Sequence, residues 1–203
     1  NILFIKPLAF FRFFYPSLIW KKQGTKKIWL TFDDGPTPEV TEHILSVLKS
    51  EKILATFFLV GKDISNNLPL YEKIKTDGHT VGNHTNSHLN GWKTSTKKYI
   101  QDIEKCQKLM ANNKLFRPPY GKITSRQIFK LKKKYKLILW DILSYDFKEK
   151  NSYNLKRNVL DNISDGSIIV FHNNLKSYTL LKETLKDIII ELKKLGYSFS
   201  SSW

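Results

Sequence analysis

The chain has 203 residues, enough for one globular domain whose core needs no disulfide bonds. Hydrophobic residues make up 41% of the chain and aromatic residues 13%, a composition that excludes an intrinsically disordered protein. The formal net charge is +16, from 34 basic and 18 acidic residues, and such a charge attracts anionic polymers and surfaces. The lysines are scattered over predicted helix exteriors and no nucleic-acid-binding motif accompanies them, so we expect no nucleic-acid partner. The single cysteine, Cys106, is expected to be a small buried side chain.

Residues 1–25 are predicted to form an aromatic-rich N-terminal arm. Aromatic residues recur between Phe4 and Trp20, but Lys6, Arg12 and two prolines interrupt the run. A membrane span needs about 20 continuous apolar residues, and a signal peptide ends in a small-residue cleavage site, so the arm fits neither. Two interpretations stay open: the arm contacts a membrane or cell wall as an aromatic and basic segment, or it packs across the base of the domain. The compartment is therefore open between cell envelope and cytoplasm.

Residues 26–203 are predicted to form a single domain, because no repeat, linker or low-complexity segment divides them, and we expect this protein to be a monomer. Short apolar runs alternate with amphipathic stretches, which predicts a parallel sheet, either closed as a barrel or open and doubly wound. Strands are expected at 28–32, 55–60, 79–82, 114–117, 136–140, 167–171 and 197–200, and helices at 38–50, 65–76, 94–112, 124–134, 153–163 and 178–195. Thr37 is expected to cap the first helix, with Pro38 in its first turn.

Two adjacent carboxylates, Asp33 and Asp34, follow the first predicted strand and precede a Gly-Pro turn. Neighbouring like charges repel, so the pair suits a site where a cation binds one carboxylate and the other acts as a base. His84 and His88 are spaced i, i+4, which would place both rings on one face of a helical turn. One carboxylate and two imidazoles leave a fourth position open, as in catalytic zinc sites.

Two more polar residues, Arg117 and His172, end later predicted strands. The carboxyl ends of the strands of a β/α barrel share one face, where active sites lie. We therefore expect Arg117 and His172 to meet Asp33 and His84 there.

Five motifs in order resemble those of the polysaccharide deacetylases of the NodB-homology type, also called carbohydrate esterase family 4. They are Thr-Phe-Asp-Asp-Gly-Pro at 31–36, His-x-x-x-His at 84–88, Arg-Pro-Pro-Tyr-Gly at 117–121, the run at 140–147, and Val-Phe-His at 170–172. The resemblance spans about residues 28–199 and implies a distorted (β/α)7 barrel. It also implies a metal-dependent hydrolase that removes N-acetyl groups from N-acetylglucosamine units of an acetylated glycan, either peptidoglycan or a chitin-type oligosaccharide.

The resemblance implies a role for each reacting group. Asp34, His84 and His88 would bind the metal, Zn²⁺ or another divalent transition metal. Asp33 would be the general base, and His172 the general acid that protonates the leaving amine.

Three further residues would support these groups. Arg117 would pair with the base and keep it ionised, and Tyr120 would offer its backbone N–H to the oxyanion. Asp146 would orient the acid histidine and raise its pKa, with Asp141 as a nearby alternative.

Some residues depart from the motifs or lack support. Phe147 stands where the family usually has Trp, and Val170 and Asn173 replace its usual Leu and Asp. None of these departures removes a reacting group. His43 and His79 belong to no motif and are expected to be structural.

Two alternatives to N-deacetylation use the same residues. An O-deacetylase of the acetyl xylan esterase type needs the same water and oxyanion site with less help from an acid. A glycan-binding module without catalysis would keep the fold and the groove.

Overall fold

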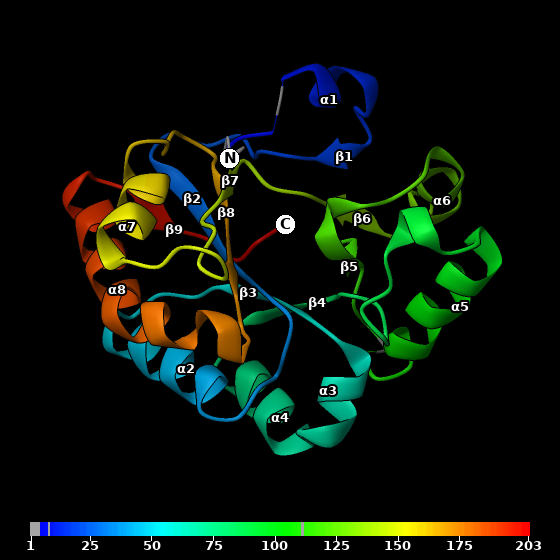
Figure 1. Ribbon diagram of the computed structural model, residues 1–203, viewed down its shortest axis with the longest axis horizontal. Coiled ribbons are helices and arrows are strands. Elements are labelled where there is room, and N and C mark those ends of the chain that lie inside the picture. Colours follow the sequence, from blue (N-terminus) through cyan, green and yellow to red (C-terminus); the bar gives the residue numbers. More distant parts are fainter. Residues whose placement is uncertain (1–4, 8, 111) are drawn as a thin grey trace.

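The computed structural model describes residues 5–7, 9–110 and 112–203, and within these ranges all side chains except those of residues 9–11. In the described part, nine strands form one sheet in the order β1-β6-β5-β4-β3-β2-β8-β7, with β9 beside β2, and all of these strands pair in parallel (Figure 1). The strands are β1 (Leu18–Ile19), β2 (Lys27–Asp33), β3 (Thr56–Leu59), β4 (Thr80–Asn83), β5 (Leu115–Phe116), β6 (Lys136–Ile138), β7 (Ile142–Leu143), β8 (Ile168–His172) and β9 (Ser198–Phe199).

The helices surround this curled sheet (Figure 1). They are α1 (Ala9–Phe14), α2 (Val40–Ser50), α3 (Gly61–Asn66), α4 (Leu68–Thr76), α5 (Thr96–Gln107), α6 (Ser125–Leu131), α7 (Ser152–Leu160) and α8 (Leu175–Lys194), with the 3₁₀ turns η1 (Gly91–Lys93) and η2 (Pro119–Gly121). The parallel sheet and its outer helices confirm the predicted distorted (β/α)7 barrel.

The chain between β6 and β7 crosses the gap between the two edges of the sheet. The Leu139 N–H bonds to the carbonyl of Ile19 in β1, and the Asp141 N–H bonds to the carbonyl of Ile168 in β8. Residues 139–141 therefore bring the two ends of the sheet together without a continuous ladder, which is the distortion of the barrel.

Alternate side chains of the central strand β2 point to opposite sides, one toward the apolar core under the helices and the other into the barrel. Ile28, Leu30 and Phe32 belong to the large apolar cluster shared with the helices, and Phe32 stacks on Phe57 and Phe171 with ring centroids 5.1 and 6.0 Å apart. The intervening residues of β2 point into the barrel, so Asp33 lies at its interior face, at the carboxyl end of the strand.

The C-terminal residue Trp203 packs inside the barrel, at the end where the strands begin. The Trp203 indole N–H donates to the Thr56 hydroxyl, and its ring lies 6.3 Å from those of Trp29 and Phe58. The Trp29 indole N–H donates in turn to the carbonyl of Ser202. The barrel is thus packed at one end and polar at the other.

The predicted start of the helix at 38–50 is wrong. This helix, α2, begins at Val40, after Glu39 with φ of 61°, and the Glu39 side chain forms no capping hydrogen bond. The Thr37 hydroxyl donates instead to the carbonyl of Asn173. Tertiary contact with the segment after β8 therefore outweighs the local capping preference.

The helix predicted at 65–76 is two helices, α3 and α4, which break at Asn67. The Asn67 amide donates to the carbonyls of Pro36 and Asp63, and a proline opens α4. The break ties this segment to the turn that follows β2.

Part of the predicted arm of residues 1–25 joins the sheet. Strand β1 pairs with β6 in the register Leu18 to Leu137, and Leu18 is buried. Phe13 of α1 is 81% exposed. Residues 1–4 and 8 lie outside the described residues, and so do the side chains of residues 9–11. No helix in the described ranges is long and apolar enough to span a bilayer.

The arm is anchored by an ion pair between Arg12 and the buried Asp141, whose second oxygen accepts from the Ser167 hydroxyl. Replacing Arg12 by methionine would leave Asp141 buried without its cation. We expect Arg12→Met to lower the free energy of unfolding by about 1–3 kcal/mol in urea titrations. Arg12→Met/Asp141→Asn should recover much of this loss, whereas Arg126→Met, at an exposed site, should change little. A loss in Arg12→Met no greater than in Arg126→Met would contradict the anchor.

Candidate active site

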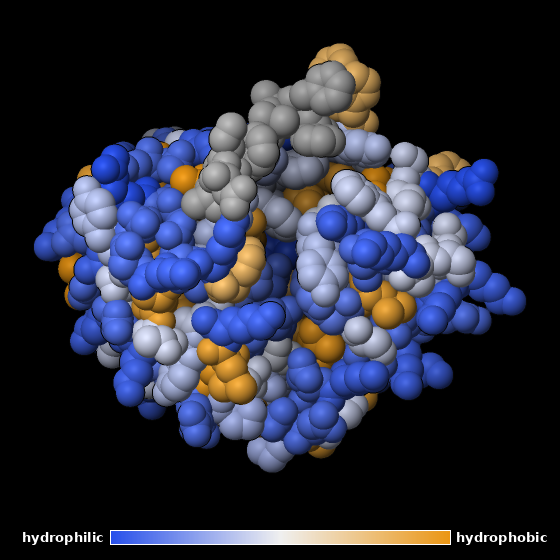
Figure 2. All heavy atoms as spheres, viewed as in Figure 1, coloured by the Kyte–Doolittle hydropathy of each residue, from blue (hydrophilic) through white to orange (hydrophobic). Residues whose placement is uncertain are grey.

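The carboxyl ends of β2, β4, β5 and β8 bring the predicted site residues to one pocket. Asp33 and His172 are register partners on the neighbouring strands β2 and β8. His84 follows β4 directly, and Arg117 follows β5. The pocket has a volume of about 830 Å³, in the range of small-molecule sites. Figure 2 shows this face of the molecule hollowed near its centre, between the side that carries α8 and the side that carries α5 and α6.

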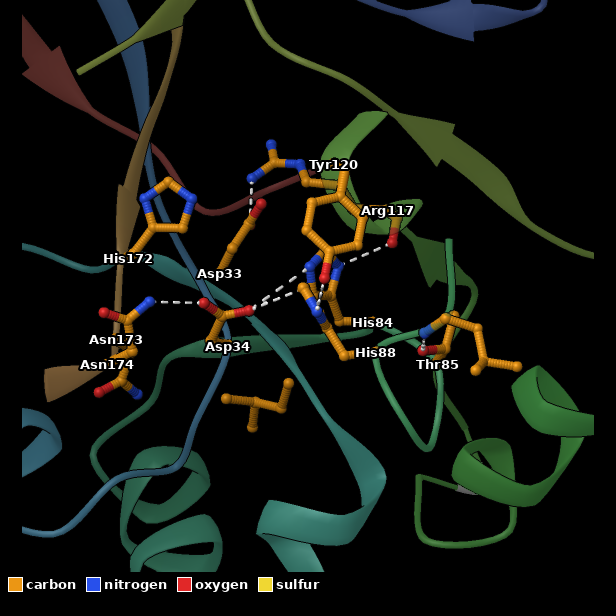
Figure 3. Close-up of polar contacts among 12 residues, drawn as sticks. Asp33, Asp34, His84, Thr85, His88, Arg117, Tyr120, His172, Asn173 and Asn174 are labelled. Atoms are coloured by element: carbon orange, nitrogen blue, oxygen red, sulfur yellow. Dashed lines mark hydrogen bonds and ion pairs between the residues drawn. The ribbon is translucent and has the colours of Figure 1, made fainter. Parts of the chain in front are cut away.

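Asp34, His84 and His88 form a potential metal site, as predicted (Figure 3). One ligand atom from each residue lies within 4.8 Å of the others. The Nε2 atoms of His84 and His88 lie 3.8 and 3.1 Å from Oδ1 of Asp34. One carboxylate and two imidazoles are a donor set that divalent transition metals accept.

The surroundings of His84 set the tautomer and the neutral charge that a metal-binding imidazole needs. Its Nδ1 lies 2.8 Å from the backbone carbonyl of Arg117, which can only accept a hydrogen bond. Nδ1 therefore carries the proton, and the lone pair of Nε2 points to Asp34. Burial lowers the pKa of His84 to about 4, so the imidazole is neutral at neutral pH. The site thus fits a metal ion, since a second hydrogen bond sets the tautomer of most metal-binding histidines.

The prediction that His84 and His88 share a helical turn is wrong, although their rings do meet. The segment between them is a loop, with φ of 65° at Thr85 and 53° at His88. Oδ2 of Asp102 in α5 accepts the N–H groups of Asn86 and the next residue, both at 2.9 Å. A contact from a neighbouring helix therefore shapes this loop.

Tyr120 contacts the second histidine through its side chain. The phenol oxygen lies 3.0 Å from Nδ1 of His88, and the two ring centroids are 4.6 Å apart. Tyr120 has φ of 60° and is 59% exposed. The prediction of an oxyanion-binding backbone N–H stays a prediction. Sequence analysis did not predict the contact between the Tyr120 hydroxyl and His88, because the two residues belong to different motifs.

Asp34 is held from the other side by Asn174, which the motifs did not single out. The Asn174 amide donates to Oδ2 of Asp34 at 2.7 Å, while its own carbonyl oxygen caps α8. Burial favours the protonated form of Asp34, but the hydrogen bond to His88 and the nearby imidazoles of His84 and His172 outweigh it and lower the pKa of Asp34.

Gly35 allows the close approach of the segment after β8. It has φ of 68°, and a Cβ atom there would lie 2.4 Å from the Asn173 amide. A larger residue would therefore push apart the segments that hold Asp34 and Asn174.

Arg117 is fully buried and pairs with Asp33, as predicted. Its Nη1 donates to Oδ1 of Asp33 at 2.6 Å and to the Thr31 hydroxyl at 2.7 Å. Its Nη2 donates to the carbonyl of Leu139, and its guanidinium lies 4.1 Å from the ring centroid of Phe58. Because Oδ1 of Asp33 is engaged in this way, Oδ2 is the oxygen available to accept a proton from the pocket.

His172 pairs with Asp146, and the alternative Asp141 lies elsewhere. Nδ1 of His172 is 2.7 Å from Oδ1 of Asp146, and its backbone N–H donates to Oδ2 at 2.6 Å. Burial alone would lower the pKa of His172, but the charge and hydrogen bond of Asp146 outweigh it and raise this pKa to about 9. The imidazole is therefore protonated at neutral pH.

An apolar wall completes the pocket beside His172. The wall consists of Trp140, Leu143, Phe147 and Val170. The Phe147 ring lies edge-on to His172, with the centroids 4.8 Å apart. The phenylalanine thus still walls the groove, without the hydrogen-bond donor of an indole.

Cys106 and His79 make structural contacts in the described part of the chain. Cys106 is fully buried, and Nδ1 of His79 accepts the N–H of Ala55. Both residues lie away from the pocket lining, and so does His43.

The contact between Tyr120 and His88 can be tested by removing one oxygen. Tyr120→Phe deletes the partner of Nδ1 of His88, so we expect the dissociation constant for a divalent metal such as Zn²⁺ to rise about tenfold. Competition with a chromophoric chelator measures it. Tyr153→Phe, at an exposed position in α7, is the matched control. Equal metal affinities of Tyr120→Phe and the unchanged protein would refute this support.

Comparison with known proteins gives one family. The chain matches the family model for polysaccharide deacetylases over residues 21–137. It is 33% identical over 180 residues to a peptidoglycan-N-acetylglucosamine deacetylase of Bacillus cereus, covering 85% of this chain and 66% of the relative. A second B. cereus protein of the same description is 33% identical over 189 residues, covering 89% and 88%. The crystal structure of the peptidoglycan N-acetylglucosamine deacetylase Bc1960 superimposes with a TM-score of 0.88 at 30% identity, covering 94% of this chain and 93% of that one. The chain therefore belongs to the polysaccharide deacetylase family.

Proposed function

We propose that this chain is a metal-dependent hydrolase that removes N-acetyl groups from N-acetylglucosamine units of a glycan and releases acetate. The observation that carries the proposal is the pairing of Asp33 with His172 across β2 and β8, beside three potential metal ligands. A carboxylate and a protonated imidazole on neighbouring strands can serve one reacting group from two sides. The deacetylase relatives support the substrate class.

Asp34, His84 and His88 would hold the metal, and Zn²⁺ is the ion that best suits this donor set. When bound, it supplies Lewis acidity toward a water molecule and the acetamide carbonyl.

Asp33 would accept the proton of the attacking water through Oδ2. Arg117 holds the other oxygen, so the carboxylate cannot rotate away, and Thr31 fixes the guanidinium in turn. The base is thus oriented by a chain of hydrogen bonds that is complete before substrate binds.

His172 would donate a proton to the nitrogen that leaves. An amine leaves an amide poorly unless it is protonated as the C–N bond breaks. Since Asp146 holds Nδ1, the proton available to the substrate is on Nε2. The apolar side chains of Leu143 and Val170 offer a surface for the acetyl methyl group.

Acetate release from chitooligosaccharide and from peptidoglycan fragments tests the proposal, with a chelator to remove the metal and Zn²⁺ to restore it. Asp33→Asn should bind Zn²⁺ as the unchanged protein does and lose about 10²–10⁴-fold in kcat, because the amide cannot accept a proton. His84→Ala should lose the metal itself, as elemental analysis would show. Full turnover by Asp33→Asn would refute the assignment of Asp33 as the general base. Glycan binding without acetate release, whichever divalent metal is added, would favour a binding module.

The pH profile tests the acid. His172 must be protonated to act, so kcat should fall as pH rises through its pKa of about 9. Asp146→Asn removes the charge that raises this pKa, so the alkaline limb should move to lower pH, while the acidic limb should stay in place. An alkaline limb at the same pH in both proteins would exclude His172 as the acid. Asp161→Asn, on the exposed end of α7, is the control.

A further inference from the structure

Two lysines line the catalytic pocket without any part in the proposed chemistry. They are Lys62 in α3 and Lys176 in α8. Both are exposed, and among the described residues neither ammonium group forms an ion pair. Two free cations in a catalytic pocket favour an anionic substrate.

Both lysines are tied to the metal site through the backbone. The Lys62 N–H donates to the carbonyl of Asn86, within the loop that carries His84 and His88. Lys176 lies two residues after Asn174, whose amide holds Asp34. The lysines therefore line the pocket on the side of α3 and α8, next to the segments that carry the potential metal ligands.

The two lysines differ in the charges around them. Asp63 follows Lys62, lines the same pocket, and has its pKa raised first by burial and then by Asp34, with Lys62 acting in the opposite direction. Part of the charge of Lys62 is therefore balanced by Asp63. The first turn of α8 contains no acidic residue, so the charge of Lys176 is uncompensated there.

We infer that Lys176, assisted by Lys62, binds an anionic group on the sugar beside the acetamide that is hydrolysed. The lactyl carboxylate of N-acetylmuramic acid has this chemistry and this place in a glycan strand without stem peptides, where it is not tied up in an amide bond. The inference rests on the proposed function and narrows its substrate, from any N-acetylated glycan to an anionic one. A neutral chitin-type oligosaccharide is then the poorer substrate.

The same charges have an opposite effect on the product. Each deacetylation turns a neutral acetamide into an ammonium group. A neighbouring glucosamine is therefore repelled by Lys176, and partly deacetylated glycan is the poorest of the three substrates. Loss of the lysine changes the preference for anionic and for cationic glycan in opposite directions, which a general structural defect cannot do.

The test compares kcat/KM for acetate release from three tetrasaccharides, with Zn²⁺ bound to the protein. One alternates N-acetylglucosamine and N-acetylmuramic acid, one is neutral chitotetraose, and one is partly N-deacetylated chitotetraose. In Lys176→Gln we expect the anionic-to-neutral ratio to fall about threefold to tenfold at low salt, and the cationic-to-neutral ratio to rise. Both changes should shrink at about 0.5 M salt, where the screening length is only a few ångströms.

Three variants control the comparison. Lys182→Gln changes an exposed lysine of the same helix that does not line the pocket, and should leave both ratios unchanged. Lys176→Arg keeps the charge and should keep the ratios. Lys62→Gln should give a smaller fall than Lys176→Gln, because Asp63 already offsets Lys62.

Unchanged ratios in Lys176→Gln, or an equal loss on all three glycans, would overturn the inference while acetate release from chitotetraose still upheld the proposed function. Acetate release from none of the three glycans by the unchanged protein would overturn the proposed function, and the inference with it.

Discussion

The buried guanidinium of Arg117 connects the parts of the site that the chain supplies from different strands. Its side chain donates to Asp33 on β2, and its backbone carbonyl faces Nδ1 of His84 after β4. Its backbone N–H bonds to the carbonyl of Asn83, so the residue is also tied to the end of β4. A fully buried cation costs several kcal/mol in lost hydration, which is offset here by a carboxylate, a hydroxyl, a carbonyl and an aromatic ring. The side chain of Arg117 thus fixes the position of Asp33, the proposed base, and its backbone fixes the tautomer of His84, a potential metal ligand.

This arrangement depends on the alternation of β2. One face of the strand packs on the helices through Ile28, Leu30 and Phe32, so its register cannot slip without burying polar groups. The other face then runs along the barrel from Trp29 to Asp33. Trp29 is buried at one end, and the carboxylate of Asp33 lies where the strand ends. The apolar core therefore fixes where Asp33 enters the pocket.

The sequence was informative wherever the signal is local. Apolar runs located the long strands, and the ordered motifs identified Asp33, Asp34, His84, His88, Arg117 and His172 together with their convergence. Strands β1 and β7, of two residues each, carry no period and exist because neighbouring strands offer them partners. The bend that joins His84 to His88 depends on Asp102, well over ten residues further along the chain. The i, i+4 spacing alone therefore predicted a helical turn, whereas a loop brings the two histidine rings together.

Other parts of the site could be recognised only in three dimensions. Asn174 looks like a helix cap in the sequence, and it is one, but its amide reaches a carboxylate 140 positions away. The Tyr120 hydroxyl and the two pocket lysines likewise belong to motifs or helices that give no sign of what they face. Polar side chains with one evident local role can have a second role, which is visible only once the fold places their other atoms.

The pairing of opposite charges explains how the proposed acid and base can lie side by side. Asp33 and His172 are register partners on adjacent strands, where their opposite charges could bond to each other. Each has instead its own counter-charge, since Asp33 bonds to Arg117 and His172 bonds to Asp146. Asp146 raises the pKa of His172 to about 9, so in the proposed reaction the imidazole keeps its proton until the amine leaves the substrate. The two flanking ion pairs thus orient Asp33 as the proposed proton acceptor and keep His172 protonated as the proposed donor.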